Sequence, residues 1–303
     1  MIGQQYLMLP GPTPIPERVL QAMNRPMINH RGPEFKDMLL EVTKGVKMVY
    51  GTDHNLLIYP SSGTGVLEAS IVNFISPGDK VLAISIGVFG DRFASIAQNF
   101  GAQVQKLSFK WGQAADPTQL REALARDQEK KIKAVLVTHN ETSTGTFNDI
   151  KAIKEAMQDH PALLMVDCVS GLGALEFQMD AWGVDVALSG SQKAFMIPPG
   201  LGFMAFSDRA LKIHRRNTNH RFYWDVTEGL KYLEKGQTAF TPAVSLFYGL
   251  QEALSMMLEE GLDHIIKRHR RYRDMVRASI RAMGLDLLAA DTEASTAVTA
   301  VLA

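Results

Sequence analysis

The chain has 303 residues, of which 32 are Lys or Arg and 32 are Asp or Glu, so its formal net charge is zero. This balance gives no indication of a nucleic-acid partner. The single cysteine, Cys168, excludes a disulfide framework within the chain, a four-thiolate metal site and an iron–sulfur cluster. We expect Cys168 to pack rather than react, and we expect no bound metal.

Residues 1–6 lack the positively charged and apolar regions of a signal peptide. No apolar run in the sequence is long enough to cross a membrane. We therefore expect a cytoplasmic protein without a membrane partner.

The first motif follows the apolar run 56–59, where the chain changes to the small and hydroxyl residues of segment 61–65, ahead of a helical pattern. Glycines let the backbone approach a ligand, and free N–H groups at a helix start favour a phosphate. Glu68 stands where a dinucleotide fingerprint requires a third glycine, and the Lys-Ser/Thr pair of a P-loop is absent. The motif therefore favours a single phosphate group.

Apolar runs and amphipathic segments alternate through the middle of the chain. The runs predict strands at 80–86, 133–138, 163–167, 184–189 and 202–206. The amphipathic segments predict helices at 118–129, 149–158 and about 245–260. This alternation is typical of an α/β fold with a mostly parallel sheet, and the length suits one large domain plus part of a second.

One short apolar run, residues 162–166, ends in the carboxylate Asp167. Ligands of open α/β sheets gather at the carboxyl ends of the strands, and a buried carboxylate needs a partner. A pyridinium nitrogen would supply one. The alternative is that Asp167 caps the next helix or turn.

A lysine, Lys193, closes the segment Ser189-Gly190-Ser191-Gln192-Lys193 after another apolar run. An amine at a strand end is a candidate Schiff-base former, provided that desolvation or nearby positive charge lowers its free pKa of about 10.4. A lysine on the cofactor aldehyde with an Asp on the ring nitrogen is the signature of pyridoxal phosphate (PLP). The alternative is an ordinary solvated charge.

A basic cluster, residues 267–273, follows Leu262, Ile265 and Ile266 and precedes Met275 and Val276. The apolar residues stand at helical spacing, so we expect the charges to form the wet face of an amphipathic helix rather than a nucleic-acid patch.

Together and in this order the motifs resemble the class-V aminotransferases, especially the alanine–glyoxylate / serine–pyruvate group. That group includes cyanobacterial members labelled as a soluble hydrogenase subunit, a label that the lone cysteine argues against. The resemblance covers nearly the whole chain. It is carried by Leu9-Pro10-Gly11-Pro12-Thr13-Pro14, His30-Arg31, Ser62-Gly63-Thr64-Gly65, Gly87-Val88-Phe89-Gly90-Asp91-Arg92, residues 138–145, Asp167-Cys168-Val169-Ser170, residues 189–193 and Phe240-Thr241-Pro242.

The resemblance implies the PLP-transferase fold type I, with a mostly parallel sheet in a large domain and a smaller C-terminal α+β domain. Residues 16–245 would form the large PLP-binding domain, and residues 1–15 and 246–303 an N-terminal arm and part of the small domain. Family members continue beyond a strand expected at 297–302, and the arginine that clamps the substrate carboxylate lies in that continuation. The small domain is therefore expected to be incomplete, leaving that strand without neighbours.

The resemblance also implies residue roles. Lys193 would hold the cofactor on its amine and move the substrate proton, and Asp167 would keep the ring nitrogen protonated. The other cofactor contacts would be Ser62, Gly63, Thr64 and Gln192 at the phosphate, Phe89 and Val169 on the two ring faces, Thr142 at the ring hydroxyl, and Thr241 at the phosphate of a neighbouring subunit. Without a ligand, the two apolar residues would belong to the core and Thr142 to a turn.

The sequence thus predicts a homodimeric PLP-dependent transaminase for small amino-acid and 2-oxo-acid substrates. It would move an amino group from alanine or serine to glyoxylate, or to pyruvate, in ping-pong half reactions. One alternative is another fold-type-I PLP enzyme, a lyase or an aminophosphonate transaminase. The second is a non-catalytic PLP-binding relative, against which the intact Lys193, Asp167 and Gln192 argue.

Overall fold

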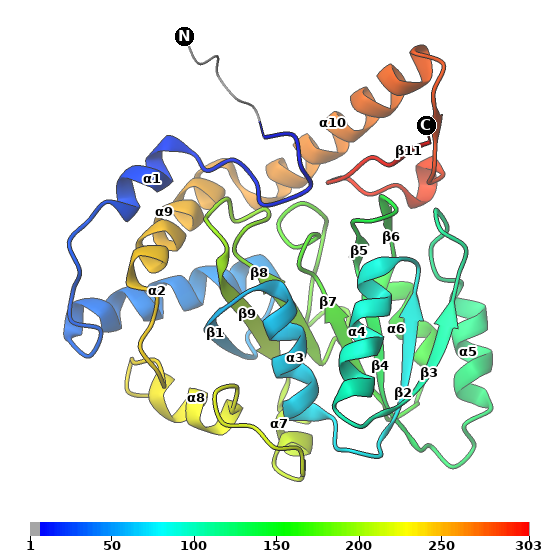
Figure 1. The fold of residues 1–303 in the computed structure, drawn as a ribbon, viewed down its shortest axis with the longest axis horizontal. Coiled ribbons are helices and arrows are strands. Elements are labelled where there is room, and N and C mark those ends of the chain that lie inside the picture. The colour runs from blue at the N-terminus through cyan, green and yellow to red at the C-terminus, as the bar shows by residue number, and fades with distance from the viewer. Residues whose placement is uncertain (1–6, 303) are drawn as a thin grey trace.

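The computed structural model describes residues 7–302, in which helices and strands alternate along most of the chain (Figure 1). The segment 1–6, examined above for a signal peptide, lies outside the described residues. The helices are α1 Glu17–Met23, α2 Pro33–Tyr50, α3 Gly63–Phe74, α4 Val88–Asn99, α5 Pro117–Ala125, α6 Ile150–Met157, α7 Asp208–His214, α8 Val226–Leu233, α9 Val244–Glu260 and α10 Leu262–Ala282. The strands are β1 Asn55–Ser61, β2 Lys80–Ser85, β3 Gln103–Ser108, β4 Ile132–Thr138, β5 Asn140–Glu141, β6 Thr146–Phe147, β7 Leu163–Asp167, β8 Val186–Gly190, β9 Gly200–Phe206, β10 Asp286–Leu287 and β11 Val301–Leu302.

A seven-stranded sheet in the order β1-β9-β8-β7-β4-β2-β3 forms the centre of the molecule. Strand β9 runs antiparallel to both of its neighbours, and every other adjacent pair is parallel. Strands β1, β8, β7, β4 and β2 therefore all end at the same edge, which is uppermost in Figure 1. The predicted mostly parallel α/β fold is confirmed.

Helices cover both faces of this sheet (Figure 1). Helices α2, α5, α6 and α9 pack on one face, and α3, α4, α7 and α8 on the other. Alternate residues of β7 serve the two cores: Leu164 and Val166 enter the first, and Leu163 and Met165 the second. A strand covered on both faces needs apolar side chains at every position, which explains the continuous apolar runs in the sequence.

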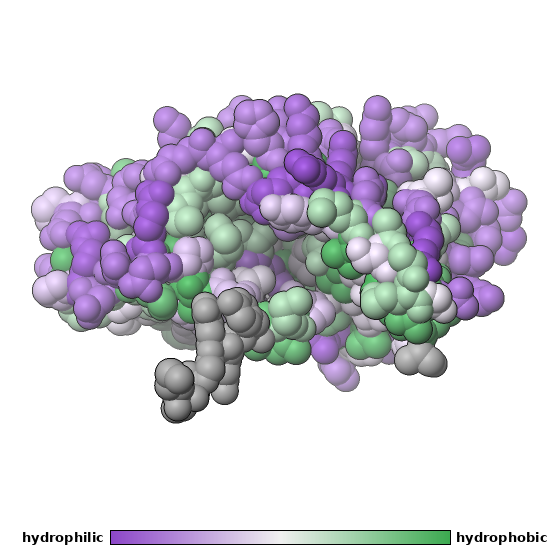
Figure 2. Space-filling model, turned by 90° about the horizontal axis from the view of Figure 1, so that it is seen from above, coloured by the Kyte–Doolittle hydropathy of each residue, from purple (hydrophilic) through white to green (hydrophobic). Residues whose placement is uncertain are grey.

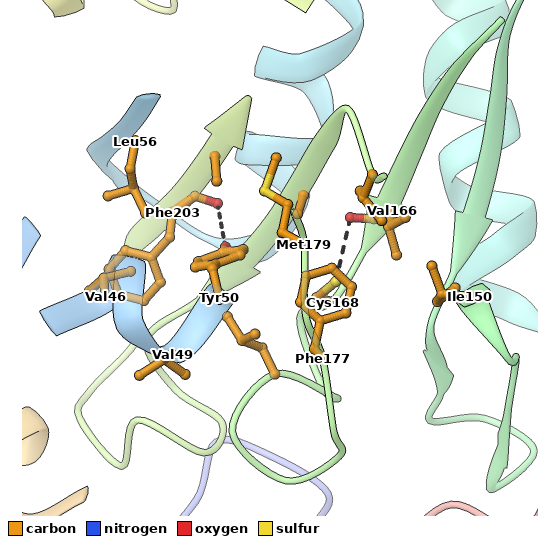
Figure 3. Close-up of a cluster of buried hydrophobic side chains, with 14 of the residues drawn as sticks. Val46, Val49, Tyr50, Leu56, Ile150, Val166, Cys168, Phe177, Met179 and Phe203 are labelled. Atoms are coloured by element: carbon orange, nitrogen blue, oxygen red, sulfur yellow. Dashed lines mark hydrogen bonds between the residues drawn. The ribbon is translucent and has the colours of Figure 1, made fainter. Parts of the chain in front are cut away.

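The core between α2 and the sheet contains the chain's only cysteine (Figure 3). Tyr50, at the end of α2, is buried and donates its hydroxyl to the carbonyl oxygen of Phe203 at 3.2 Å. Cys168 lies in the same core, and its thiol is 3.8 Å from the carbonyl oxygen of Val166. Burial raises the pKa of this thiol well above its usual value, so it remains a packing group, as predicted.

The C-terminal segment departs from the prediction. The strand expected at 297–302 is wrong over 297–300, because only Val301–Leu302 is extended, paired with Asp286–Leu287. The hydroxyl of Ser295 accepts the N–H groups of Ala297 at 3.0 Å and Val298 at 3.1 Å, which turns the chain there. The short strand also has a neighbour, contrary to expectation.

The predicted amphipathic helix forms as α10, and the basic cluster 267–273 is exposed or partly exposed on it, as expected. The buried face departs from the prediction further along the helix. Met275 is 55% exposed, whereas Arg277 is only 3% exposed. The Arg277 guanidinium donates to Asp291 and to the carbonyl oxygen of Ala289, each at 2.7 Å, so the polar pairing brings that side of the helix inward. No helix within residues 7–302 is long and apolar enough to cross a membrane.

Candidate active site

All but one of the predicted site residues lie near the sheet edge where β1, β2, β4, β7 and β8 end. Figure 2 views the molecule from this side and shows a hollow near the middle of the face, with hydrophilic residues along much of its rim. Because parallel strands present their carboxyl ends together, side chains far apart in the sequence meet here.

Asp167, the last residue of β7, is a buried carboxylate. It accepts hydrogen bonds from the Val169 N–H at 2.9 Å and from the Thr138 hydroxyl at 3.4 Å. Desolvation raises the pKa of Asp167 to about 6, and the neighbouring charge of Glu141 acts in the same direction while the Val169 hydrogen bond opposes it. A buried acid with a raised pKa is suited to receive a cationic partner.

Lys193 follows the adjacent strand β8 and is half-buried. Desolvation lowers the pKa of its amine, and the negative charge of Asp167 partly opposes that shift. The two groups therefore interact electrostatically across neighbouring strands. An amine with a lowered pKa is a better nucleophile and proton carrier at neutral pH.

The N-terminal arm contacts this lysine, which sequence reasoning did not predict. The Lys193 amine donates to the carbonyl oxygen of Pro10 at 3.0 Å, and the Thr13 hydroxyl donates to the carbonyl oxygen of Lys193 at 3.1 Å. A Cβ atom at Gly11 would lie 2.4 Å from the amine, so a side chain there would force the Lys193 side chain to move. The feature of the sequence that could have indicated this contact is the segment 9–14, which was used only as part of the family resemblance.

The start of α3 presents unused hydrogen-bond donors to the same edge. Ser62 caps the helix by accepting from the Gly65 N–H at 3.4 Å. The N–H groups of Gly63 and Thr64 lie in the first turn, where no acceptor exists within the helix. Gly63 packs on Val169, since a Cβ atom at Gly63 would lie 2.8 Å from its Cγ2.

Gln192 lies beside this helix start. A Cβ atom built on Gly190 would lie 3.0 Å from the Gln192 side-chain oxygen and 3.4 Å from the backbone nitrogen of Gly63. The Gln192 side chain and the Gly63 N–H group therefore border the same point. That oxygen is buried and has no hydrogen-bond partner within residues 7–302. A side-chain amide can present either its oxygen or its N–H groups by rotating half a turn, so Gln192 is available to a ligand.

Phe89, in the first turn of α4, is half-buried at the end of β2. The Arg92 guanidinium carbon lies 4.8 Å from the Phe89 ring centroid, and the same guanidinium donates to the Thr64 hydroxyl at 3.3 Å. Arg92 thus joins the helix start to the aromatic ring. Sequence reasoning assigned Arg92 no role, although it belongs to the segment 87–92.

Thr142 lies just after β5 in a hydrogen-bonded turn. Its hydroxyl donates to the Ser170 hydroxyl at 2.8 Å, and Ser170 in turn donates to the carbonyl oxygen of Asn140 at 2.9 Å. This places Thr142 next to the segment 167–170, which carries Asp167 and Val169.

Thr241 is the predicted site residue that the structure does not bring to this edge. It is exposed in the loop between α8 and α9. The Arg31 guanidinium holds that loop by donating to Gln237 at 3.0 Å and to the carbonyl oxygen of Thr238 at 2.8 Å. Its predicted role concerns another subunit and stays a prediction.

The polar groups at this sheet edge match those of a phosphorylated pyridine cofactor. The free N–H groups of α3 suit a phosphate, the Lys193 amine suits an aldehyde, and the buried Asp167 suits a pyridinium nitrogen. Within residues 7–302, no three His, Cys, Asp or Glu side chains are grouped so that they could hold a metal ion.

Known proteins provide an independent comparison. The model of the family described as Aminotransferase class-V matches residues 5–302. The soluble hydrogenase 42 kDa subunit of Anabaena cylindrica is 45% identical over 99% of this chain and 79% of its own length. The serine–glyoxylate aminotransferase of Methylorubrum extorquens is 40% identical over 99% of this chain and 77% of its own length.

A solved structure agrees with these sequence matches. The crystal structure of alanine–glyoxylate aminotransferase from Nostoc sp. has a TM-score of 0.95 and 31% sequence identity, covering 100% of this chain and 81% of that one. The predicted fold type is therefore confirmed.

Proposed function

Because this chain belongs to the class-V aminotransferases, we propose that it moves an amino group from alanine or serine to glyoxylate. Membership of this family makes the protein a transaminase with pyridoxal phosphate as its cofactor. The observation that carries the proposal is the pairing of a desolvated Lys193 with a buried Asp167 at neighbouring strand ends.

The residues of the site fit the cofactor one by one. Gly63, Thr64 and Gln192 would bind its phosphate, with Ser62 holding the helix start in place. Phe89 and Val169 would pack on the two faces of its ring, and Thr142 would reach its hydroxyl. These assignments are proposals that rest on the shared edge and on the donor set described above.

The bound cofactor supplies an electron-withdrawing ring that accepts the electron pair of the substrate Cα–H bond. Asp167 stabilises a protonated ring nitrogen because a cation compensates its buried charge. Lys193 takes the proton from the substrate Cα as a general base and returns it as a general acid. Its lowered pKa increases the fraction of neutral amine that can take that proton.

The names of similar proteins support the choice of substrates. The Methylorubrum relative is a serine–glyoxylate aminotransferase, and the Nostoc structure is an alanine–glyoxylate aminotransferase. Glyoxylate is common to both names, so we propose it as the acceptor. The single cysteine of this chain argues against iron–sulfur chemistry of the kind that a hydrogenase label suggests.

We further propose that the active form is a cytoplasmic homodimer. An aromatic cluster of exposed Phe222 and Tyr223 and half-buried Phe240 lies next to Thr241, and the Tyr223 and Phe240 rings stack at 4.8 Å. Aromatic side chains of this kind are enriched in protein interfaces. Burying the cluster against a second copy would place Thr241 at the subunit boundary.

The test of the function is an absorption spectrum of the purified protein with added PLP, followed by a panel of amino donors and oxo-acid acceptors. We expect a visible band from cofactor bound to Lys193, a change in that band with alanine or serine, and glycine formed from glyoxylate. A bound cofactor that reacts with none of alanine, serine, aspartate or an aminophosphonate would favour the non-catalytic alternative. No band at any PLP concentration would contradict the site itself.

A further inference from the structure

The first turn of α4 needs hydrogen-bond acceptors that its own residues do not provide. The helix begins at Val88 after Gly87, which has no side chain to cap it. The N–H groups of Val88, Phe89 and Gly90 cannot reach a carbonyl within the helix. Leaving such groups unpaired next to a buried core would be costly.

Two residues from a distant loop supply these acceptors. One Glu141 oxygen accepts from the Phe89 N–H at 3.0 Å and from the Gly90 N–H at 3.1 Å. The Ser143 hydroxyl accepts from the Val88 N–H at 3.0 Å and donates to the other Glu141 oxygen at 2.6 Å. The two side chains therefore cap α4 from outside.

Glu141 is fully buried, with 0% of its surface exposed. No Lys, Arg or His within residues 7–302 forms an ion pair with it. Its charge is instead compensated by N–H groups and by the positive end of the α4 dipole. A buried carboxylate held by backbone N–H groups and one hydroxyl fixes those donors firmly, because moving them would leave the charge unpaired.

The fit around this cap is tight. A Cβ atom at Gly87 would lie 2.5 Å from the Ser143 hydroxyl oxygen and 2.6 Å from the Glu141 carboxyl carbon. A side chain at position 87 would therefore displace the Ser143 and Glu141 side chains that cap α4.

The cap also joins Phe89 to β5, which follows directly after the strand β4 that contacts Asp167. Glu141 lies in β5, three residues after Thr138, whose hydroxyl donates to Asp167. The Phe89 backbone is thus tied to the segment that directly follows the end of β4, where Thr138 contacts Asp167. Arg92 lies against the Phe89 ring at 4.8 Å and completes its support.

We infer that Glu141 is a positioning residue that sets the Phe89 ring against the cofactor ring. This inference rests on the proposed function, since it assigns how one of the proposed cofactor contacts is held. Glu141 does not touch the reacting atoms and acts through the backbone of Phe89.

The test compares Glu141→Gln, Phe89→Leu and the double variant by equilibrium titration of the apoprotein with pyridoxal phosphate. The amide of Glu141→Gln would keep the size of the side chain but only one acceptor oxygen, so the α4 donors or Ser143 would lose a partner. Each single variant is expected to weaken cofactor binding by about 10-fold, the value of a good aromatic contact. The double variant is expected to bind no worse than Phe89→Leu alone, because Glu141 acts through that ring.

Asp116→Ala is the matched control. Asp116 caps α5 by accepting from the Thr118 N–H at 2.8 Å, and its helix packs on the opposite face of the sheet from α3 and α4. This control should lower thermal stability and leave cofactor affinity unchanged. If Glu141→Gln does not fold, Gly87→Ala perturbs the same contact from the helix side and should weaken binding by about the same factor.

Four results are decisive. Unchanged affinity in Glu141→Gln, or a double variant whose loss is the product of the two single losses, would overturn the inference and leave the proposed function standing. A double variant equal to Phe89→Leu supports it. A parent protein that takes up no cofactor would overturn the proposed function, and the inference with it.

Discussion

At the ends of β1 and β8, several polar groups of the site have no partner within residues 7–302, whereas at the ends of β2 and β4 the first turn of α4 is capped by side chains from another segment. The first half contains the free N–H groups of Gly63 and Thr64 and the unpaired Gln192 oxygen. In the second half, Glu141 and Ser143 satisfy the start of α4. The first half is therefore built to receive a ligand, and the second to hold side chains in place.

Lys193 belongs to the ligand-receiving half, and its removal should have the largest effect. We expect Lys193→Ala to bind the cofactor without a covalent link and to lose transamination by about 10³-fold or more, the scale of a missing general acid–base group. The measurement is single-turnover conversion of alanine, with the visible spectrum recorded before and after.

Lys154→Ala is the matched control for that prediction. Lys154 is also half-buried, and burial lowers the pKa of its amine too, but it lies on α6 away from the site edge. Its removal should leave turnover near the parent rate. Equal losses in the two variants would mean that desolvation of a lysine, rather than its place at the strand end, accounts for the effect.

Asp167→Asn should have the next largest effect. Losing a charge-assisted hydrogen bond to the ring nitrogen is expected to slow the half reaction by about 100-fold. Cofactor should still bind through Lys193 and the phosphate contacts. A variant with the parent rate would remove Asp167 from the mechanism.

Asp167→Asn should also change how the stability of the apoprotein depends on pH. Burial raises the Asp167 pKa from 3.8 to about 6, so between those values the folded state binds more protons than the unfolded state. The parent therefore loses stability as pH rises through this window, by about 3 kcal/mol in total, whereas the amide of the variant cannot ionise. The stability advantage of Asp167→Asn should grow from pH 4 to pH 6 and then stay constant.

Because His139 also changes stability with pH, the difference in stability between the parent and Asp167→Asn is more informative than the pH curve of either protein alone. Burial lowers the pKa of His139 to about 4, so its contribution to stability is lost as pH falls below 6.5. This trend opposes that of Asp167 and is shared by the parent and the variant. Chemical unfolding of both apoproteins at each pH isolates the Asp167 contribution.

The sequence identified the residues that end an apolar run, because a strand end is a local pattern. Asp167 and Lys193 were found in this way, and the alternating runs predicted the parallel sheet. The cap on α4 has no local pattern, since Phe89 and Glu141 are 52 residues apart and meet only after the strands align. The strand expected at 297–302 was wrong over 297–300, because a single side chain, Ser295, competes for the backbone N–H groups there.

Gln192→Leu, in the ligand-receiving half, should weaken cofactor affinity without lowering the stability of the apoprotein. The buried Gln192 oxygen has no partner within the described chain, so an apolar residue of similar size should leave apoprotein stability unchanged or raise it. Cofactor binding should weaken by about 10-fold, because the phosphate loses one hydrogen bond. Thermal unfolding and PLP titration of the same preparation measure both. A loss of stability without a loss of affinity would place Gln192 in the scaffold instead.

Ser143→Ala should have the smallest effect, and it tests the half in which Glu141 and Ser143 cap α4. The variant removes the acceptor for the Val88 N–H and one donor to Glu141, but Glu141 still accepts from Phe89 and Gly90. Loss of one capping contact is expected to lower stability by about 1 kcal/mol. Cofactor affinity should stay within about twofold of the parent, because the N–H groups nearest the ring keep their acceptor. An affinity loss as large as that of Glu141→Gln would show that Ser143 and Glu141 act as one unit, and that the orientation of Phe89 depends on the whole cap rather than on the carboxylate alone.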